Sequence, residues 1–359
     1  MYGWRRVFAR TLVAAVAVAG TALVGAEPAH ADGGFGLGID LGSLYGGASV
    51  AWSINSGGTI AGTSDGLPVM WVNRQIHLLP LPAGFTGGTV RDINDSGVGV
   101  GHVWNDDGAI RAVRWDGLNS VSLLEDNAPG GSGAYGINNA GLITGFADFA
   151  DGTGRIPVRY ASGKAQFLDP RDVPGTGYTI SRLGQVFVGN EVTGGVQHAF
   201  EVGLGRGGYM QLPSIVCCGP SAAWAVSNYG NRIFGNSDAG NGRSHPTMWL
   251  SSLGPNFTLT WKAWDLDPNS DWDGYVNDST GSGSFAVGTE VNTRGAPGAP
   301  QGASIPVFWQ KWNRTPLVDP GGSGSCDTRG ANGINDSLTV VGYGCTADQA
   351  VHAMLWQGS

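Results

Sequence analysis

A short motif recurs seven times along this chain, and the repeat limits the possible folds more than any other feature. Its first copy reads Ala51-Trp52-Ser53-Ile54-Asn55, with a Gly two residues later, and then Ile60-Ala61-Gly62. Each copy has an apolar run, then Asn or Ser, then Gly, and then a second apolar run that ends in Gly. The same order returns at residues 90–101, 134–145, 177–189, 223–235, 273–288 and 331–342. Self-similarity at such a period is typical of repeat architectures.

Two further runs follow most copies of the motif. The third run reads Leu67-Pro68-Val69-Met70-Trp71 in the first repeat and recurs at 111–115, 156–160, 198–202, 245–249, 305–309 and 352–356. A fourth, shorter apolar run closes most repeats. Four short runs in roughly 40–50 residues, separated by Asn, Asp and Gly, are typical of a propeller blade with four strands.

The repeats therefore predict an all-β fold, a seven-bladed β-propeller. The last repeat has no fourth run, and residues 37–41 precede the first repeat as an unpaired one, so we expect this N-terminal strand to close blade seven. The sixth repeat is degenerate; we align its Val276-Asn277 with Ile54-Asn55 and keep six blades as the alternative.

The repeats also account for an unusual glycine content. The chain has 62 Gly among 359 residues, and each Gly inside a helix costs about 1 kcal/mol relative to Ala, which excludes an all-α fold. Hydrophobic residues make up 41% of the chain, enough to form a core. Most of the glycine falls at turns and strand ends of the repeat, where it supplies positive φ.

The repeat resembles that of the extracellular HAF-repeat proteins of bacteria, which reads A-x-x-I-N-x-x-G-x-V-x-G, then H-A-F-L-W, then D-L-G-T-L-G-G. The matching residues here are His198-Ala199-Phe200, His352-Ala353-Met354-Leu355-Trp356 and residues 40–47. The resemblance implies secretion and a propeller-like fold, and it implies no established biochemical activity.

The first 31 residues are expected to be a signal peptide. Arg5, Arg6 and Arg10 precede an apolar run at 11–24, and Ala29-His30-Ala31 forms an A-x-A cleavage site. The start also resembles a twin-arginine signal, so export by either the general or the twin-arginine route stays open. We expect residues 32–359 to be a single propeller domain of about seven repeats, secreted to the extracellular space.

The charge balance narrows the range of partners. The formal net charge is −8, and an acidic surface repels phosphate backbones and anionic lipid heads. No run after the signal peptide is long enough to span a bilayer. We expect neither nucleic acid binding nor membrane insertion, and we expect a monomer.

The four cysteines are expected to form disulfides because the chain is exported. Cys326 and Cys345 flank the first strand pair of blade seven and are predicted to pair. Cys217 and Cys218 are adjacent, and they form either a vicinal disulfide or two thiols.

One segment is rich in oxygen ligands. Asp267, Asn269, Asp271 and Asp273 alternate along the chain, as residues that wrap Ca²⁺ can do, and Asp278 follows at the twelfth place of such a loop. The alternative is a solvated acidic turn. No other cofactor is predicted.

The candidate ligand-binding residues occupy the second position of the inner strands. They are Trp52, Arg91, Tyr135, Tyr178 and Trp224, and Gly274 and Asn332 fill the same place in repeats six and seven. Flat rings with an Arg suit stacking on a sugar or an amphipathic ligand. The alternative is that these rings pack between blades.

These features favour a secreted binding module for a glycan or another extracellular ligand. We place the site on the long-loop face, where residues 80–88, 213–221, 289–304 and 319–330 emerge. One alternative is a hydrolase or lyase with Asp92 and Asp273 as acid and base, although no catalytic spacing is visible. Another is a scaffold for protein partners.

Overall fold

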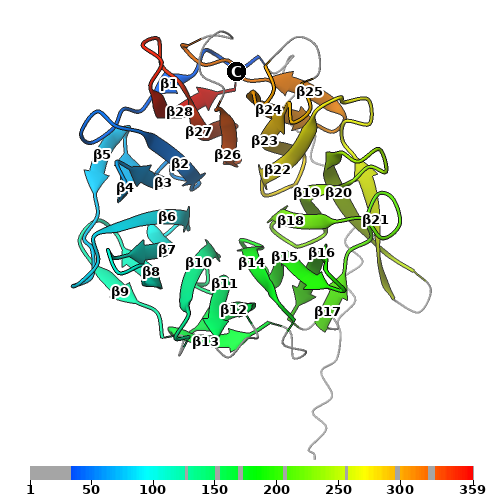
Figure 1. The fold of residues 1–359 in the computed structure, drawn as a ribbon, viewed down its shortest axis with the longest axis horizontal. Coiled ribbons are helices and arrows are strands. Elements are labelled where there is room, and N and C mark those ends of the chain that lie inside the picture. The colour runs from blue at the N-terminus through cyan, green and yellow to red at the C-terminus, as the bar shows by residue number, and fades with distance from the viewer. Residues whose placement is uncertain are drawn as a thin grey trace, which may run out of the picture.

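Seven antiparallel sheets of four strands each are arranged radially around a central channel (Figure 1). This computed structural model describes residues 34–125, 128–149, 154–168, 173–204, 208–254, 258–295, 300–321 and 328–358. The described residues contain strands and turns and no helix. The predicted all-β, seven-bladed propeller is confirmed, and the signal-peptide prediction for residues 1–31 lies outside the described residues.

The blades follow one another along the chain. Blade 1 contains β2 (Ser49–Ile54), β3 (Ile60–Ser64), β4 (Leu67–Val72) and β5 (Gln75–Leu78). Blade 2 contains β6 (Gly87–Ile93), β7 (Val98–Trp104), β8 (Ile110–Asp116) and β9 (Val121–Leu123). Blade 3 contains β10 (Gly131–Ile137), β11 (Ile143–Phe149), β12 (Gly154–Ala161) and β13 (Lys164–Phe167). Blade 4 contains β14 (Gly175–Ile180), β15 (Val186–Thr193), β16 (Val196–Gly203) and β17 (Gly208–Gln211).

The remaining blades have the same order. Blade 5 contains β18 (Ser221–Val226), β19 (Arg232–Asp238), β20 (Ser244–Leu253) and β21 (Leu259–Asp265). Blade 6 contains β22 (Asp273–Ser279), β23 (Phe285–Val291), β24 (Ser304–Gln310) and β25 (Asn313–Pro316). Blade 7 contains β26 (Gly330–Ile334), β27 (Thr339–Cys345), β28 (Val351–Gln357) and β1 (Ile39–Asp40).

Strands from both ends of the described chain share blade 7. β1 pairs antiparallel with β28, with Ile39 opposite Leu355 and Asp40 opposite Met354. Beyond the strand, Leu41 accepts a hydrogen bond from the Trp71 indole of blade 1 at 3.0 Å.

The hydrophobic core lies between neighbouring blades. One cluster joins Met70 and Leu79 of blade 1 to Val90, Val103 and Trp115 of blade 2, all of them buried. The tryptophans of the third runs are the largest fully buried side chains: Trp71, Trp115, Trp249, Trp309 and Trp356. Four of the five indole nitrogens donate a hydrogen bond to a backbone carbonyl in the segment that precedes the first strand of the blade. The nitrogen of Trp309 is the exception. In blades 1, 2, 5 and 7 the third-strand tryptophan thus both fills the core and ties the blade to the segment that leads into it.

Every inner strand carries a bulge at one fixed position. In β2 the register shifts between Ala51 and Ser53, so Trp52 has no partner on β3. The residue before the bulge pairs in each blade with a second-strand glycine: Gly62, Gly101, Gly145, Gly189, Gly235, Gly288 and Gly342. A Cβ at any of these glycines would overlap a backbone carbonyl oxygen of the inner strand. The bulge therefore requires glycine across from it.

The sixth repeat is aligned differently in the structure from the alignment that we predicted. Its bulge lies between Val276 and Asp278, so Asn277, and not Gly274, occupies the position of Trp52. Thr280 then holds the place of Asn55, and Gly283 donates to the Thr280 carbonyl as Gly58 does to that of Asn55. The predicted alignment is wrong because Val276-Asn277 imitates the Ile-Asn pair three residues too early.

The asparagine of the Ile-Asn pair links each blade to the next. In Asn94 the side-chain oxygen accepts from the Val98 amide at 3.0 Å, which closes its own turn, and the side-chain nitrogen donates to the Asn138 carbonyl of blade 3 at 3.1 Å. The same inter-blade bond is made by Asn55, Asn138 and Asn335. Ser181, Ser227 and Thr280 replace Asn in blades 4–6, and their hydroxyls accept only within their own turn.

The requirement for glycine opposite the bulge can be tested by substitution. We expect Gly101→Ala to lower the free energy of unfolding by about 1–3 kcal/mol, because the added Cβ would overlap the Thr89 carbonyl oxygen and the backbone would have to shift to relieve the overlap. Gly57→Ala is the matched control, because its Cβ would make an ordinary contact at 3.5 Å. Urea unfolding of both variants measures the difference; equal stability of the two would contradict the requirement.

A second test concerns the asparagine links. Asn94→Ser keeps the turn and loses the bond to blade 3, so we expect it to cost about 1 kcal/mol, and Asn94→Ala to cost more because the turn bond is lost too. Asn105→Ser is the control: Asn105 closes the turn between β7 and β8 and makes no hydrogen bond to another blade within the described chain. If the two Ser variants were equally stable, the inter-blade bond would contribute nothing.

Candidate ligand site in the central channel

A cavity of about 380 Å³ lies in the central channel, and all seven inner strands contribute to its wall. This volume falls within the range of small-molecule sites. The bulges explain the lining: an unpaired bulge residue turns its side chain out of the sheet, and here it turns toward the axis. The bulge residues Trp52, Arg91, Tyr135, Tyr178, Trp224, Asn277 and Asn332 all line the cavity.

The five predicted ligand-binding side chains come together in one continuous arc. The Arg91 guanidinium lies 3.9 Å from the ring centroid of Trp52 and 5.3 Å from that of Tyr135. Tyr135 and Tyr178 meet edge to face at 5.9 Å, and Tyr178 stacks on Trp224 at 3.9 Å. We call these five residues of blades 1–5 the aromatic arc.

The aromatic arc shows features of both interpretations that the sequence left open. Its side chains are half-buried and reach the cavity, as a binding site requires. Neighbouring rings also contact each other between blades, so part of each ring face is already covered by its neighbour. A ligand would therefore meet ring edges and the remaining exposed faces.

The cavity lies toward the tight turns of the first and second strands. Its rim includes Ser56, Asp95, Asn139, Asn228 and Asp336, each within such a turn. The predicted position of the aromatics on the long-loop face is therefore wrong. The bulge comes late in the inner strand: only two residues separate Trp52 from Asn55, so its side chain is nearer the turn than the linker.

Opposite the aromatic arc the cavity wall is polar. The Asn277 side chain donates to the Ala331 carbonyl at 2.8 Å, and that of Asn332 donates to the Ala51 carbonyl at 2.9 Å. These amides take the place of the rings in blades 6 and 7 and bind each blade to the next. The channel thus has an aromatic side and a polar side.

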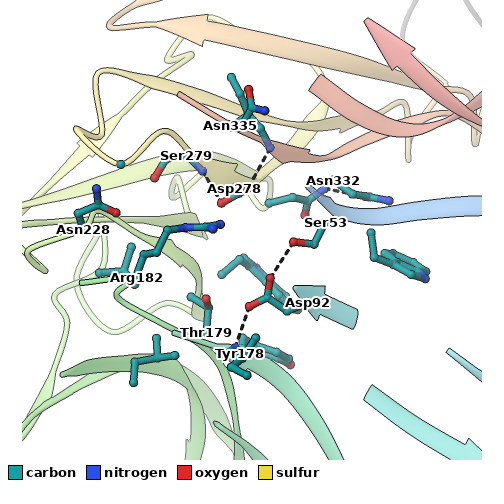
Figure 2. A pocket seen from close by; sticks show the side chains of 18 of the residues that line it. Ser53, Asp92, Tyr178, Thr179, Arg182, Asn228, Asp278, Ser279, Asn332 and Asn335 are labelled. Carbon is teal, nitrogen blue, oxygen red and sulfur yellow. Dashed lines mark hydrogen bonds between the residues drawn. The ribbon is translucent and has the colours of Figure 1, made fainter. Parts of the chain in front are cut away.

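Two carboxylates occupy equivalent places just after the bulge, and both bridge blades. Asp92 accepts from the Ser53 hydroxyl at 2.7 Å and from the Ile137 amide of blade 3 at 2.8 Å. Asp278 accepts from the Ile334 amide of blade 7 at 2.9 Å. Figure 2 shows the Arg182 side chain extending toward Asp278 across the cavity.

The pKa values of these groups are shifted by burial and by one another. Burial raises the pKa of Asp92, against the opposing effects of the Arg182 charge and of three hydrogen bonds. The pKa of Asp278 is raised to about 7, mainly by burial and in part by the charge of Asp92. Burial lowers the pKa of Arg182, but the carboxylates of Asp92, Asp278 and Asp95 outweigh burial and raise it.

Asp278 and Arg182 are the functional candidates that the sequence reasoning missed. We had named Asp273 as the second inner-strand carboxylate, but it lies at the start of β22, where it accepts from the Ser244 amide at 2.7 Å and from the Thr293 hydroxyl. One spacing in the sequence could have identified Asp278. From the turn Asn or Ser to the second-strand Gly there are seven or eight residues in the other repeats. The same spacing places the turn of the sixth repeat at Thr280, and Asp278 two residues before it.

The residues proposed to bind calcium contact cationic or hydrogen-bonding partners. Asp267 lies 3.5 Å from the Arg314 guanidinium, and Asp271 lies 3.8 Å from that of Arg243. Asp273 accepts hydrogen bonds from Ser244 and Thr293, and Asp278 lines the channel. Within the described segments no group of three or more acidic, His or Cys side chains could hold a metal ion.

The three described cysteines lie outside the channel lining. Cys217 and Cys218 form a vicinal disulfide pair in the exposed segment between β17 and β18, and Cys218 has a φ of 71°. Cys345 ends β27 and is buried. Its predicted partner Cys326 lies outside the described residues, so that pairing stays a prediction.

Two histidines that begin third runs, His245 and His352, form links inside their blades. His352 Nδ1 on β28 lies 2.9 Å from Asp40 Oδ1 on β1, and His245 Nδ1 on β20 lies 2.8 Å from Asp265 Oδ2 on β21. The hydrogen bond to Asp265 raises the pKa of His245 against the effect of burial. In these two blades the His of the third run thus binds the Asp of the fourth.

Comparison with known proteins bears on the fold. No family model matches the chain, and no curated protein matches it. Similar solved structures include the putative TolB from Agrobacterium tumefaciens (12% identity, 87% of this chain and 91% of that chain, TM-score 0.46) and the tricorn protease (13% identity, 86% of this chain and 33% of that chain, TM-score 0.50). Similarity at these identities concerns the fold alone. Within the residues that the structure describes, no helix has the length and apolar character to cross a membrane.

The raised pKa of Asp278 predicts a pH dependence of stability. Because the pKa of Asp278 in the folded protein, about 7, is above the ordinary value of 3.8, the folded state holds the proton more tightly. This stabilisation is complete below pH 3.8 and is lost as the pH rises through 7. We therefore expect Asp278→Asn to gain stability relative to wild type between pH 5 and pH 8. Exposed Asp107→Asn is the control. Urea unfolding at both pH values measures it, and a pH-independent difference between Asp278→Asn and wild type would contradict this titration.

Proposed function

We propose that this protein is a secreted binding module that takes a saccharide into the channel cavity. The observation that carries the proposal is the aromatic arc: five side chains from five successive blades form one continuous wall of the cavity. Sugars present apolar C–H faces and polar hydroxyl edges, so they suit a site that combines rings with hydrogen-bonding groups.

The polar groups at the rim of the cavity support the same proposal. Asp95, Asn139, Asn228 and Asp336 line the cavity near its rim. Carboxylates and amides accept and donate hydrogen bonds to hydroxyl groups, which fixes the orientation of a sugar. Residues 1–31 and the HAF-repeat resemblance support secretion. A secreted protein would encounter extracellular glycans.

A second candidate function is a hydrolase or lyase. The observation that favours it is the pKa of Asp278, about 7, in a cavity that also holds Asp92 and Arg182. A carboxyl group with a pKa near the working pH can serve as general acid. Against this, one oxygen of Asp92 and one of Asp278 accept an amide of the next blade, which is a structural use of the same groups.

Binding to an oligosaccharide array tests the proposal. We expect the mature chain to bind at least one class of oligosaccharide, and we expect Trp52→Ala combined with Trp224→Ala to weaken that binding by at least about tenfold, or about 1.4 kcal/mol. Trp312→Ala is the control, because Trp312 is 54% exposed and lies outside the channel.

The outcomes separate the candidates. Binding that survives the double substitution would place the site elsewhere, and no binding at all would remove the proposal. Breakdown of the bound oligosaccharide by wild type, abolished in Asp278→Asn, would establish the enzyme instead. Thermal unfolding of each variant checks that the propeller is intact.

A further inference from the structure

Arg91 has an unusual environment for a half-buried cation. It occupies the bulge of β6, and its guanidinium lies over the Trp52 ring at 3.9 Å and near the Tyr135 ring at 5.3 Å. The side chain lines the channel cavity. The two rings therefore hold the guanidinium in place from both neighbouring blades.

Arg91 has no oxygen partner among the described residues. Its side-chain contacts are the two rings, and it forms neither a hydrogen bond nor an ion pair there. The carboxylate of the adjacent residue, Asp92, accepts from Ser53, Ile93 and Ile137 instead. The other channel arginine differs, because Arg182 is paired with Asp95 at 2.9 Å.

A guanidinium in this position favours an anionic partner. Arginine does not give up its proton in proteins, so the charge stays, and a buried charge without a partner is costly. Burial lowers the pKa of Arg91, opposed by Tyr135, Tyr178 and Asp92. Its five N–H donors form a planar fork that matches the two oxygens of a carboxylate.

The surrounding charge limits which anion fits. Asp92, Asp95, Asp278 and Asp336 line the same cavity, and the chain has a net charge of −8. A doubly charged phosphate would be repelled by these groups, whereas a single carboxylate adds one negative charge directly at the unpaired cation. Planar geometry and single charge therefore both favour a carboxylate.

We propose that the saccharide bound in the channel is an acidic one, with its carboxylate on the Arg91 guanidinium and its ring beside the aromatic arc. This inference rests on the proposed function and names the class of its ligand. Arg91 is then the residue that separates uronic acids from neutral sugars at this site.

Matched ligands test the inference. Isothermal titration compares oligogalacturonate with its methyl ester, which has the same rings and no charge, and with a sulfated neutral oligosaccharide. We expect the mature chain to bind the acid at least about tenfold more tightly than the ester. Arg91→Gln should remove that preference, so that acid and ester bind with the same affinity, and Arg91→Lys should keep part of it, because lysine retains the charge without the fork.

Arg74→Gln is the control for the charge change, because Arg74 is exposed, lies between β4 and β5 and is remote from the cavity lining. It should preserve the full preference for the acid. Equal binding of acid and ester by wild type, tighter binding of the sulfated ligand, or an equal loss for both ligands in Arg91→Gln would overturn the inference while the binding module stands.

A readout without oligosaccharide separates the two proposals. Free glucuronate should change the tryptophan fluorescence of wild type, since Trp52 lies against Arg91, and should leave Arg91→Gln unchanged. If no oligosaccharide binds but glucuronate gives this difference, the proposed function fails and the carboxylate site remains. If glucuronate has no effect on wild type, the carboxylate site is overturned. Arg91→Lys serves as the comparison should Arg91→Gln fail to fold.

Discussion

In all seven blades the inner strand bulges at one residue, and a glycine on the second strand makes room for it. A side chain there would overlap the inner-strand carbonyl, so the pair of bulge and glycine cannot vary independently. The bulge turns one side chain per blade toward the axis, which is how a strand buried between neighbouring blades can still present a residue to the channel. The architecture and the candidate site therefore depend on the same local constraint.

The links between blades are not uniform around the ring. Asparagine joins blades 7 to 1, 1 to 2, 2 to 3 and 3 to 4 through its side-chain nitrogen, whereas Ser181, Ser227 and Thr280 close only their own turns. Other bonds appear in blades 4–6: the Asn228 amide donates to the Gly281 carbonyl, and Asp278 accepts from blade 7. A Ser or Thr side chain is too short to close its own turn and also to reach the next blade. In these blades one residue therefore closes the turn and a different residue bonds to the next blade.

The channel combines groups that would be costly to bury singly. Asp92, Asp278 and Arg182 partly neutralise one another, and the two carboxylates also accept backbone amides of the following blades. Arg91 stands apart, because aromatic rings rather than carboxylates hold it. Rings stabilise a cation without satisfying its N–H donors, so this residue keeps its capacity to bind an oxyanion.

The sequence by itself determined the blade count, the position of the turns in every repeat but the sixth, and the membership of the aromatic arc. It could do so because equivalent residues of a repeated motif occupy equivalent places in the blades. Counting from the second-strand glycine would also have placed Thr280 and Asp278 correctly; the chance pair Val276-Asn277 hid them. Only the tertiary structure decided which face the cavity opens on, that Arg182 extends toward Asp278, and that Arg91 has no oxygen partner among the described residues. Those facts depend on how seven blades converge on one axis, which no single repeat encodes.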